Sequence, residues 1–95
     1  MGKTYWVYLL ANEGRTPYCG FTGDLNGRAG RHKFEAGSKF TSKYGVTKLV
    51  WFESYSSPQP AIEREKEIKG WRREKKIALI EAMNPEWDDL YASLN

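Results

Sequence analysis

The chain has 95 residues, a formal net charge of +3 and an aromatic content of 15%, which includes four Trp and six Tyr. This length fits one domain, and so many large apolar side chains exclude a disordered chain because they favour a packed core. One cysteine excludes an internal disulfide, and we find neither a leader pattern nor an apolar run of about 18 residues. We therefore expect a single cytoplasmic domain over residues 1–95 that does not bind a membrane.

The first third of the chain is predicted to form a β-hairpin. Residues 5–10, YWVYLL, are a short apolar run of aromatic and aliphatic side chains, typical of a strand buried on both faces. Residues 12–17 contain Gly and Pro and have a length that joins two hairpin strands, and the second strand is expected at 18–21.

A helix is expected next, over residues 25–37. Thr22 or Asp24 can cap its start, and its last residue is a glycine that can end it. Gly27 and Gly30 inside this helix each cost about 1 kcal/mol relative to Ala, so its stability is expected to depend on tertiary packing.

The remaining two thirds of the chain complete an α+β pattern. After a loop, a third strand is expected to end at a Ser- and Pro-rich breaker, and two helices follow. The last segment is expected to form a short helix or a docked tail. The predicted ranges are 37–46 for the loop, 48–54 for the strand, 56–60 for the breaker, 61–71 and 73–83 for the helices, and 87–94 for the last segment.

Two tyrosines of the hairpin are candidate functional residues. Side chains alternate between the two faces of a strand, so Tyr8 lies on the same face as Trp6 and Leu10, and Tyr18 on the same face as Gly20. If the hairpin pairs these strands, the two phenols can approach each other. The alternative is that both tyrosines are half-buried packing residues with a hydrated hydroxyl.

Arg28 and His32 are the second candidate pair. They are four residues apart, so they project from one side of the expected helix, next to the apolar Leu25 and Ala29. A guanidinium binds phosphate in a bidentate manner and an imidazole titrates near neutral pH, so the pair could hold a phosphate and relay a proton. The alternative is a solvated basic helix face.

Glu65 is the third candidate. It lies three residues from both Ile62 and Ile68, so it borders the side of its helix that must pack on the sheet. A carboxylate there is costly unless it is paired. Either a salt bridge to an arginine or a divalent metal ion could provide the partner, since one carboxylate with waters and substrate oxygens is a common Mg²⁺ site.

These residues resemble the GIY-YIG nuclease superfamily, which is named for two short strand motifs. The motifs are present as Trp6-Val7-Tyr8 and Tyr18-Cys19-Gly20, and are followed by Arg28, His32 and Glu65 in the family's order. The small bacterial stand-alone members are the most similar in FTSKYGVTKLVWFES and KKIALIEAMNPEWDDL. The resemblance spans nearly the whole chain and implies a small three-stranded antiparallel sheet flanked by helices.

The resemblance also implies an activity, a metal-dependent DNA endonuclease that uses one Mg²⁺ or Mn²⁺ ion and no small-molecule cofactor. Tyr8 would activate the attacking water, with Tyr18 beside it. Arg28 would stabilise the transition state, His32 would assist proton transfer or contact phosphate, and Glu65 would bind the metal ion. Structured DNA in repair or recombination is the expected substrate. Cys19 replaces an isoleucine of the second motif and is interpreted as a small buried hydrophobe.

The chain departs from the superfamily's repair incision enzymes at Phe21, where they carry a lysine; Lys33 or Lys43 could supply the missing charge. The sequence pI of about 9.0 makes a polyanion a plausible partner. Larger superfamily members attach separate DNA-binding domains, which we expect this chain to lack, so the resemblance implies that it binds DNA weakly, through the backbone and in a salt-sensitive way. The candidate phosphate contacts are Arg31, Lys33, Lys39 and Lys43, and the basic run at residues 69–76 is a second candidate surface. The alternatives to a nuclease are a nucleic-acid-binding module without activity and a protein interaction domain.

Overall fold

The computed structural model describes residues 2–34 and 48–94, with the backbone alone at 32–34. Three strands form an antiparallel sheet in the order β2-β1-β3. They are β1 (Tyr5–Ala11), β2 (Pro17–Thr22) and β3 (Lys48–Tyr55). The predicted hairpin and the α+β class are therefore confirmed, and β2 and β3 are the two edges of the sheet.

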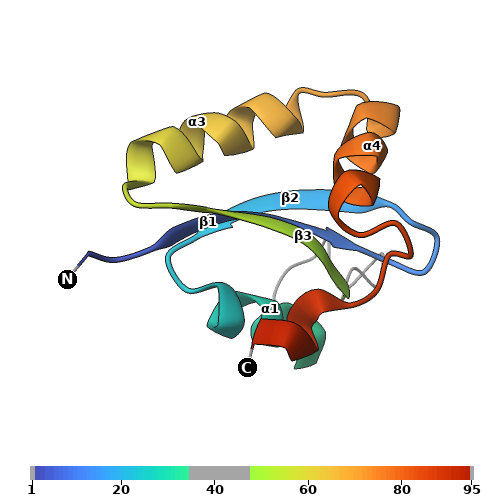
Figure 1. Ribbon diagram of the computed structural model, residues 1–95, viewed down its shortest axis with the longest axis horizontal. Helices are drawn as coiled ribbons and strands as arrows, with labels where there is room; N and C mark the ends of the chain where they lie inside the picture. Colours follow the sequence, from blue (N-terminus) through green and yellow to red (C-terminus); the bar gives the residue numbers. More distant parts are fainter. Residues whose placement is uncertain (1, 35–47, 95) are drawn as a thin grey trace.

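Helices cover both faces of this sheet. Figure 1 shows α3 and α4 on one face, and α1 together with the C-terminal 3₁₀ helix η1 on the other. No helix among the described residues is long and apolar enough to cross a lipid bilayer. The helices are α1 (Leu25–Phe34), α3 (Pro58–Lys69), α4 (Arg73–Met83) and η1 (Leu90–Leu94).

The start of α3 differs from the prediction. We expected the Ser- and Pro-rich residues 56–60 to form a breaker before a helix at Ala61, but the helix begins at Pro58. The missing N–H of a proline costs nothing in the first turn, and its fixed φ suits a helix start. The extended Ser57, with φ −140°, immediately precedes it. The predicted end of α1 at Gly37 and the loop over 37–46 lie outside the described residues.

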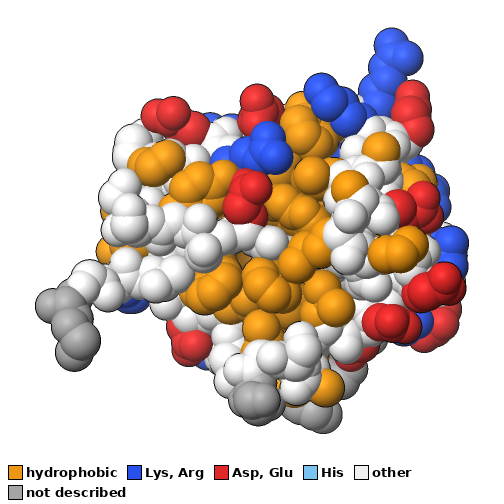
Figure 2. All heavy atoms as spheres, viewed as in Figure 1, with side chains coloured by type: hydrophobic (Ala, Val, Ile, Leu, Met, Phe, Trp, Pro, Cys, Tyr) orange, Lys and Arg blue, Asp and Glu red, His pale blue; other side chains and the backbone are white. Residues whose placement is uncertain are grey.

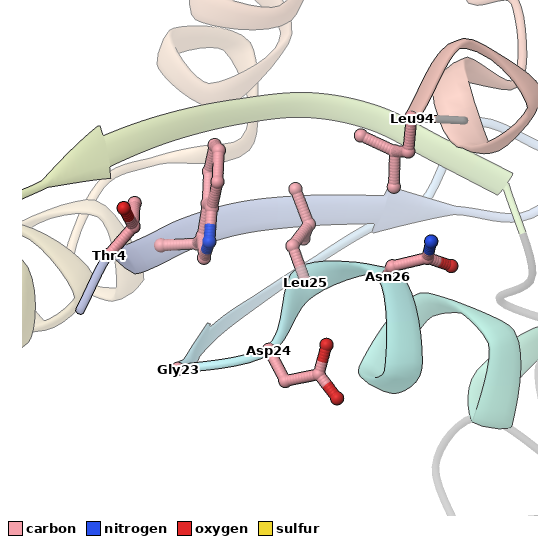
Figure 3. Close-up of a pocket in the computed structure, with 7 residues that line it drawn as sticks. Thr4, Gly23, Asp24, Leu25, Asn26 and Leu94 are labelled. Atoms are coloured by element: carbon pink, nitrogen blue, oxygen red, sulfur yellow. The ribbon is translucent and has the colours of Figure 1, made fainter. Parts of the chain in front are cut away.

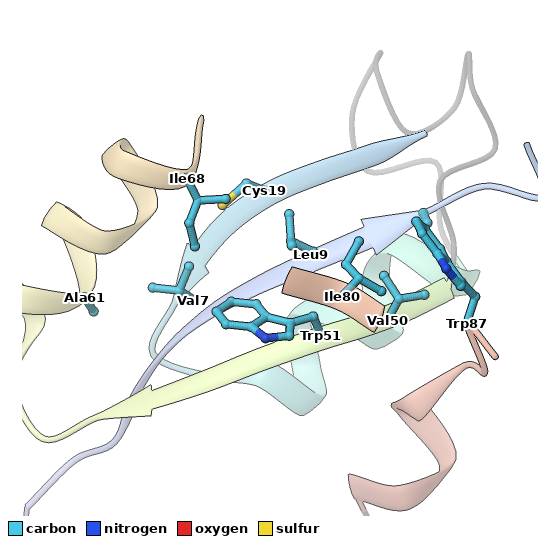
Figure 4. Close-up of a cluster of buried hydrophobic side chains, with 10 residues drawn as sticks. Val7, Leu9, Cys19, Val50, Trp51, Ala61, Ile68, Ile80 and Trp87 are labelled. Carbon is cyan, nitrogen blue, oxygen red and sulfur yellow. The ribbon is translucent and has the colours of Figure 1, made fainter. Parts of the chain in front are cut away.

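The core between the sheet and α3/α4 is apolar (Figure 4). Val7 and Leu9 of β1 point into it, with Ile68 of α3 and Ile80 of α4 packed above them. Cys19 of β2 is 3% exposed in the same core, which confirms its interpretation as a small buried hydrophobe. Burial raises the pKa of its thiol to about 11, so the thiol stays protonated near neutral pH.

The C-terminal segment crosses from α4 to the opposite face of the sheet. Asn84, which is buried, donates hydrogen bonds from Nδ2 to the carbonyls of Val50 and Asp88, at 3.1 and 2.8 Å. Trp87 is 3% exposed and donates from Nε1 to Glu81. The chain then ends in η1 beside α1 (Figure 1), so the expected short helix is also a docked tail.

Candidate active site

Tyr8 lies at the centre of the sheet face covered by α1. It pairs with Gly20 of β2 and Phe52 of β3, and it is 1% exposed. A Cβ atom at Gly20 would lie 2.3 Å from the Tyr8 hydroxyl and 2.4 Å from Cζ. The Tyr8 ring therefore extends across β2 in the space that the glycine leaves, and its hydroxyl comes to the edge strand.

Arg28 of α1 meets this hydroxyl. The two side chains are hydrogen-bonded, and Tyr18, the β2 residue two before Gly20, is close enough to act on Tyr8 electrostatically. Burial raises the pKa of Tyr8 to about 12, although Arg28 opposes this shift. The Tyr8 phenol therefore keeps its proton near neutral pH in this environment.

One atom of Arg28 is buried without a partner. Among the described residues, Nε of Arg28 is the buried side-chain nitrogen or oxygen that makes no hydrogen bond. Leaving such a donor unsatisfied costs about 1–3 kcal/mol, and more for a charged group. An anion that accepts a hydrogen bond from this guanidinium would remove that cost.

The first turn of α1 is fixed by a cap. The Asp24 backbone N–H donates to Thr22 Oγ1 at 3.0 Å, and the Gly27 N–H donates to Asp24 Oδ1 at 3.1 Å. A Cβ atom at Gly27 would lie 2.2 Å from Asp24 Oδ2, so a larger residue there would require the capping carboxylate to shift. Both predicted caps therefore contribute, and they fix the turn that leads directly into Arg28.

Glu65 approaches from the opposite face of the sheet. Its backbone carbonyl lies 3.9 Å from Cys19 Sγ, which places this part of α3 over β2. Its side chain is 18% exposed, and its carboxylate pairs with Lys69 Nζ at 2.9 Å. Of the two partners that the sequence left open, the arginine is not found: Arg64, the neighbouring arginine of α3, pairs with Glu53 and Glu67 instead, because it projects to another side of the helix.

Lys69 lies beside Glu65 on the α3 side of β2. Its hydrogen bond with Glu65 raises its pKa, and Tyr18 adds to this effect from the other side of the strand. Tyr8, Tyr18 and Arg28 therefore meet on the α1 face of β2, and Glu65 and Lys69 stand on its α3 face. Sequence reasoning missed Gly20 and Lys69; a glycine opposite a tyrosine and a lysine four residues after Glu65 were the available signals.

Several predicted residues lie partly or wholly outside this description. His32 and Lys33 belong to α1, but their side chains are not among the described ones, and Lys39 and Lys43 lie outside the described residues. Arg31 is exposed on α1.

The basic run at residues 69–76 forms the corner between α3 and α4, where Figure 2 shows Lys and Arg side chains at the top of the view. Some cations of this run contact other groups of the protein. Lys75 lies over the Trp71 ring, 4.3 Å from its centroid, and Arg64, which precedes the run, lies 5.3 Å from the same centroid. Arg73 donates to the backbone carbonyls of Gly14 and Arg15 in the β1–β2 turn.

A small hollow of about 300 Å³ lies at the start of α1. In Figure 3, Leu25 points from α1 toward the sheet, and Asn26 lies toward Leu94 of η1. Trp6 also lines it and packs edge-to-face on Phe52, with ring centroids 5.7 Å apart. The hollow thus borders the same face of β1 as Tyr8.

The described residues contain no group of three or more His, Cys, Asp or Glu side chains that could enclose a metal ion. A divalent ion at Glu65 would therefore take one protein carboxylate, with waters and substrate oxygens as its other ligands, a common arrangement for Mg²⁺. The Lys69 ammonium already occupies a cation position at this carboxylate, so the donor fits a cation.

The chain belongs to the GIY-YIG catalytic domain family, whose model matches residues 4–78.

Proteins of similar sequence occur in other organisms. A UPF0213 protein of Haloquadratum walsbyi is 35% identical over 81 residues, which cover 85% of this chain and 91% of that protein. A UPF0213 protein of Staphylococcus aureus is 34% identical over 77 residues, covering 81% and 94% of the two chains. The solution structure of the UPF0213 protein BH0048 from Bacillus halodurans matches with a TM-score of 0.58 and 28% identity, over 90% of this chain and 92% of that one.

Proposed function

We propose that this protein is a DNA endonuclease that hydrolyses phosphodiester bonds with one Mg²⁺ or Mn²⁺ ion and acts on structured DNA in repair or recombination. The observation that carries the proposal is Arg28, a partly buried cation with an unsatisfied Nε, hydrogen-bonded to Tyr8 beside the edge strand β2. Membership of a nuclease family supports it.

Arg28 is assigned the phosphate. A guanidinium donates in a planar fork that matches phosphate oxygens, and its charge is fixed at any accessible pH. When water attacks phosphorus, negative charge builds up on the non-bridging oxygens in the transition state. A preorganised donor of this kind typically contributes about 10²–10³-fold to the rate.

The two tyrosines are assigned the attacking water. We propose that Tyr8 Oη, held by Arg28, receives the water's proton and that Tyr18 orients the water from the edge strand. With a pKa of about 12, Tyr8 must first release its own proton to solvent, and this needs positive charge beyond Arg28. The bridging oxygen that leaves phosphorus then takes up a proton. We assign the donation of this proton to His32 or to solvent.

Glu65 is assigned the divalent ion. When bound there, the ion would act as a Lewis acid on a phosphate oxygen and lower the pKa of nearby hydroxyl groups. The substrate backbone is assigned to Arg31, Lys33, Lys39 and Lys43, whose charges would bind DNA without sequence preference.

A cleavage assay on a panel of end-labelled branched, mismatched and single-stranded DNAs tests the proposal. With Mg²⁺ or Mn²⁺ the wild type is expected to cut at least one of them, and Arg28→Ala to cut it about 10²–10³-fold more slowly. Arg31→Ala, a change of the same charge on the same helix, is expected to weaken binding and leave the single-turnover rate at saturating protein nearly unchanged. Equal losses in both variants would contradict the role of Arg28.

A second function, nucleic-acid binding without cleavage, has one observation in its favour. Phe21 stacks on Tyr5 in the α3-side core, with centroids 6.2 Å apart, so this β2 position brings no charge to the site. Metal-independent DNA binding that survives Glu65→Gln, with no turnover on any substrate of the panel, would favour this function.

A further inference from the structure

The Glu65–Lys69 pair sits where the proposed function needs a divalent ion. The two residues are one turn apart on α3, and Lys69 Nζ lies 2.9 Å from Glu65 Oε2. Glu65 is held close to the sheet, with 18% of its side chain exposed, whereas 52% of the Lys69 side chain is exposed. The carboxylate is thus the fixed member of the pair and the ammonium the mobile one.

An ammonium and a divalent ion cannot share one carboxylate without strong repulsion. Two cations bound to the same carboxylate lie only a few ångströms apart. At that distance they repel each other by several kcal/mol, even at an effective dielectric constant of about 20. A divalent ion that binds Glu65 would therefore compete with Lys69 for the carboxylate. The lysine has the freedom to leave, because its four-carbon stem is half exposed.

The displaced ammonium would remain near the substrate. Its partner Glu65 lies over β2, with its backbone carbonyl 3.9 Å from Cys19 Sγ, and Tyr18 is the adjacent residue of that strand. Tyr18 also contributes to the raised pKa of Lys69. On the α1 face of β2, positive charge comes from Arg28, whereas Phe21 on the α3 face brings none. Lys69 is a described cation on the α3 side of β2, and it is the one paired with Glu65.

We propose that Lys69 is a positioning residue that holds the Glu65 carboxylate in place, competes with the divalent ion for it, and on release adds positive charge beside the bound phosphate. This inference rests on the proposed function for the place of the ion and the phosphate. It makes metal binding an exchange of one cation for another, so that Glu65 is never left as a half-buried, unpaired charge.

Mn²⁺ binding to the whole chain, without DNA, tests the exchange directly. Free Mn²⁺ is measured by electron paramagnetic resonance during titration of the wild type, Lys69→Met and Lys69→Gln. Both variants are expected to bind Mn²⁺ about fivefold to tenfold more tightly, because a competing cation is gone. Glu65→Gln is expected to lose the site.

Lys66→Met is the matched control. Lys66 is exposed on the same helix, so the variant changes net charge equally and is expected to shift Mn²⁺ affinity by less than about twofold, through screened charge alone. If Lys69→Met and Lys69→Gln bind Mn²⁺ no more tightly than Lys66→Met, or if no variant binds it, the inference is overturned even where DNA is cleaved. A wild type that shows the exchange and cleaves nothing contradicts the proposed function instead.

A cleavage measurement at saturating Mn²⁺ tests the second part. Lys69→Met is expected to cut about threefold to tenfold more slowly than the wild type despite its tighter metal binding, and Lys69→Arg to recover part of the rate. A Lys69→Met rate equal to the wild-type rate would overturn the proposed contribution near the phosphate.

Discussion

The two faces of the sheet differ in what their buried side chains do. On the α3/α4 face, β1 and β2 bury Val7, Leu9 and Cys19, which form an apolar core. On the α1 face the same strands bury Tyr8 and hold Tyr18 beside it, with Arg28 above. Because side chains alternate along a strand, one hairpin supplies a stabilising face and a polar, candidate catalytic face, and each can be changed separately.

The strongest way to break the α1 face is Gly20→Ala. The new methyl group would overlap the Tyr8 ring, which is enclosed by its neighbours and cannot move away. We expect a loss of about 3 kcal/mol in the free energy of unfolding and a loss of cleavage of at least about 10²-fold in the protein that stays folded. Urea unfolding and a single-turnover assay measure the two effects.

Cys19→Ala is the control for this change, one residue away on the other face. It removes a sulfur from the apolar core and adds no overlap, so we expect about 1 kcal/mol of destabilisation and an unchanged cleavage rate. A Cys19→Ala variant that loses as much activity as Gly20→Ala would contradict the division between the faces.

Adjacent residues of β1 give a sharper comparison. Leu9→Ala is expected to destabilise the protein by about 2–5 kcal/mol through a cavity, with the cleavage rate of the folded protein unchanged. Tyr8→Phe keeps the ring and is expected to change stability by less than about 1 kcal/mol while slowing cleavage by about 10²-fold or more. Leu9→Ala should therefore lose more stability in the denaturation assay, and Tyr8→Phe should lose more activity in the cleavage assay. Parallel losses of the two variants in both assays would contradict the division between the faces.

The raised pKa of Tyr8 predicts a loss of stability at high pH. The folded-state pKa is about 12 and the ordinary value is 10.0, so the unfolded chain loses this proton first as pH rises. Stability from this group is complete below pH 10 and falls between pH 10 and 12, by up to about 2–3 kcal/mol. Urea midpoints at pH 9 and 11 should show the fall, and Tyr8→Phe should reduce it; an equal fall in both would place its cause elsewhere.

The smallest expected effect is at the cap of α1. Asp24→Ala should cost about 1 kcal/mol, because the Gly27 N–H loses its acceptor. Gly27→Ala should destabilise the wild type, where it overlaps the Asp24 carboxylate, and stabilise Asp24→Ala by about 0.5–1 kcal/mol. Thermal unfolding of the four proteins measures this coupling, and additive effects would show that the carboxylate is not the obstacle.

Much of the α1 face could be predicted because the period of a strand is short and unambiguous. With residues 5–10 and 18–21 paired in the observed register, Tyr8 and Tyr18 share a face, and the helix that starts near Asp24 brings Arg28 to that face. What could not be predicted is how far the Tyr8 ring reaches, since that depends on the register that sets Gly20 opposite it.

The α3 face was harder to predict. Glu65 has several cations within one turn on either side, and the choice among them depends on rotamers and on which side of α3 packs on β2. An arginine was one of the two partners that the sequence left open, whereas the nearest arginine is engaged by Glu53 on β3. The early start of α3 at Pro58 was missed because the proline was interpreted as a breaker instead of a first-turn residue.

The central claim is that Arg28 from one face and Glu65 from the other act on a single phosphate at the β2 edge. A double-mutant cycle of single-turnover cleavage rates, with Arg28→Ala, Glu65→Gln and the double variant, tests it most directly. We predict that the double variant is little slower than the slower single variant, because residues that act as a unit are strongly non-additive. Losses that multiply, or a wild type without cleavage of any DNA in the panel, would contradict the claim.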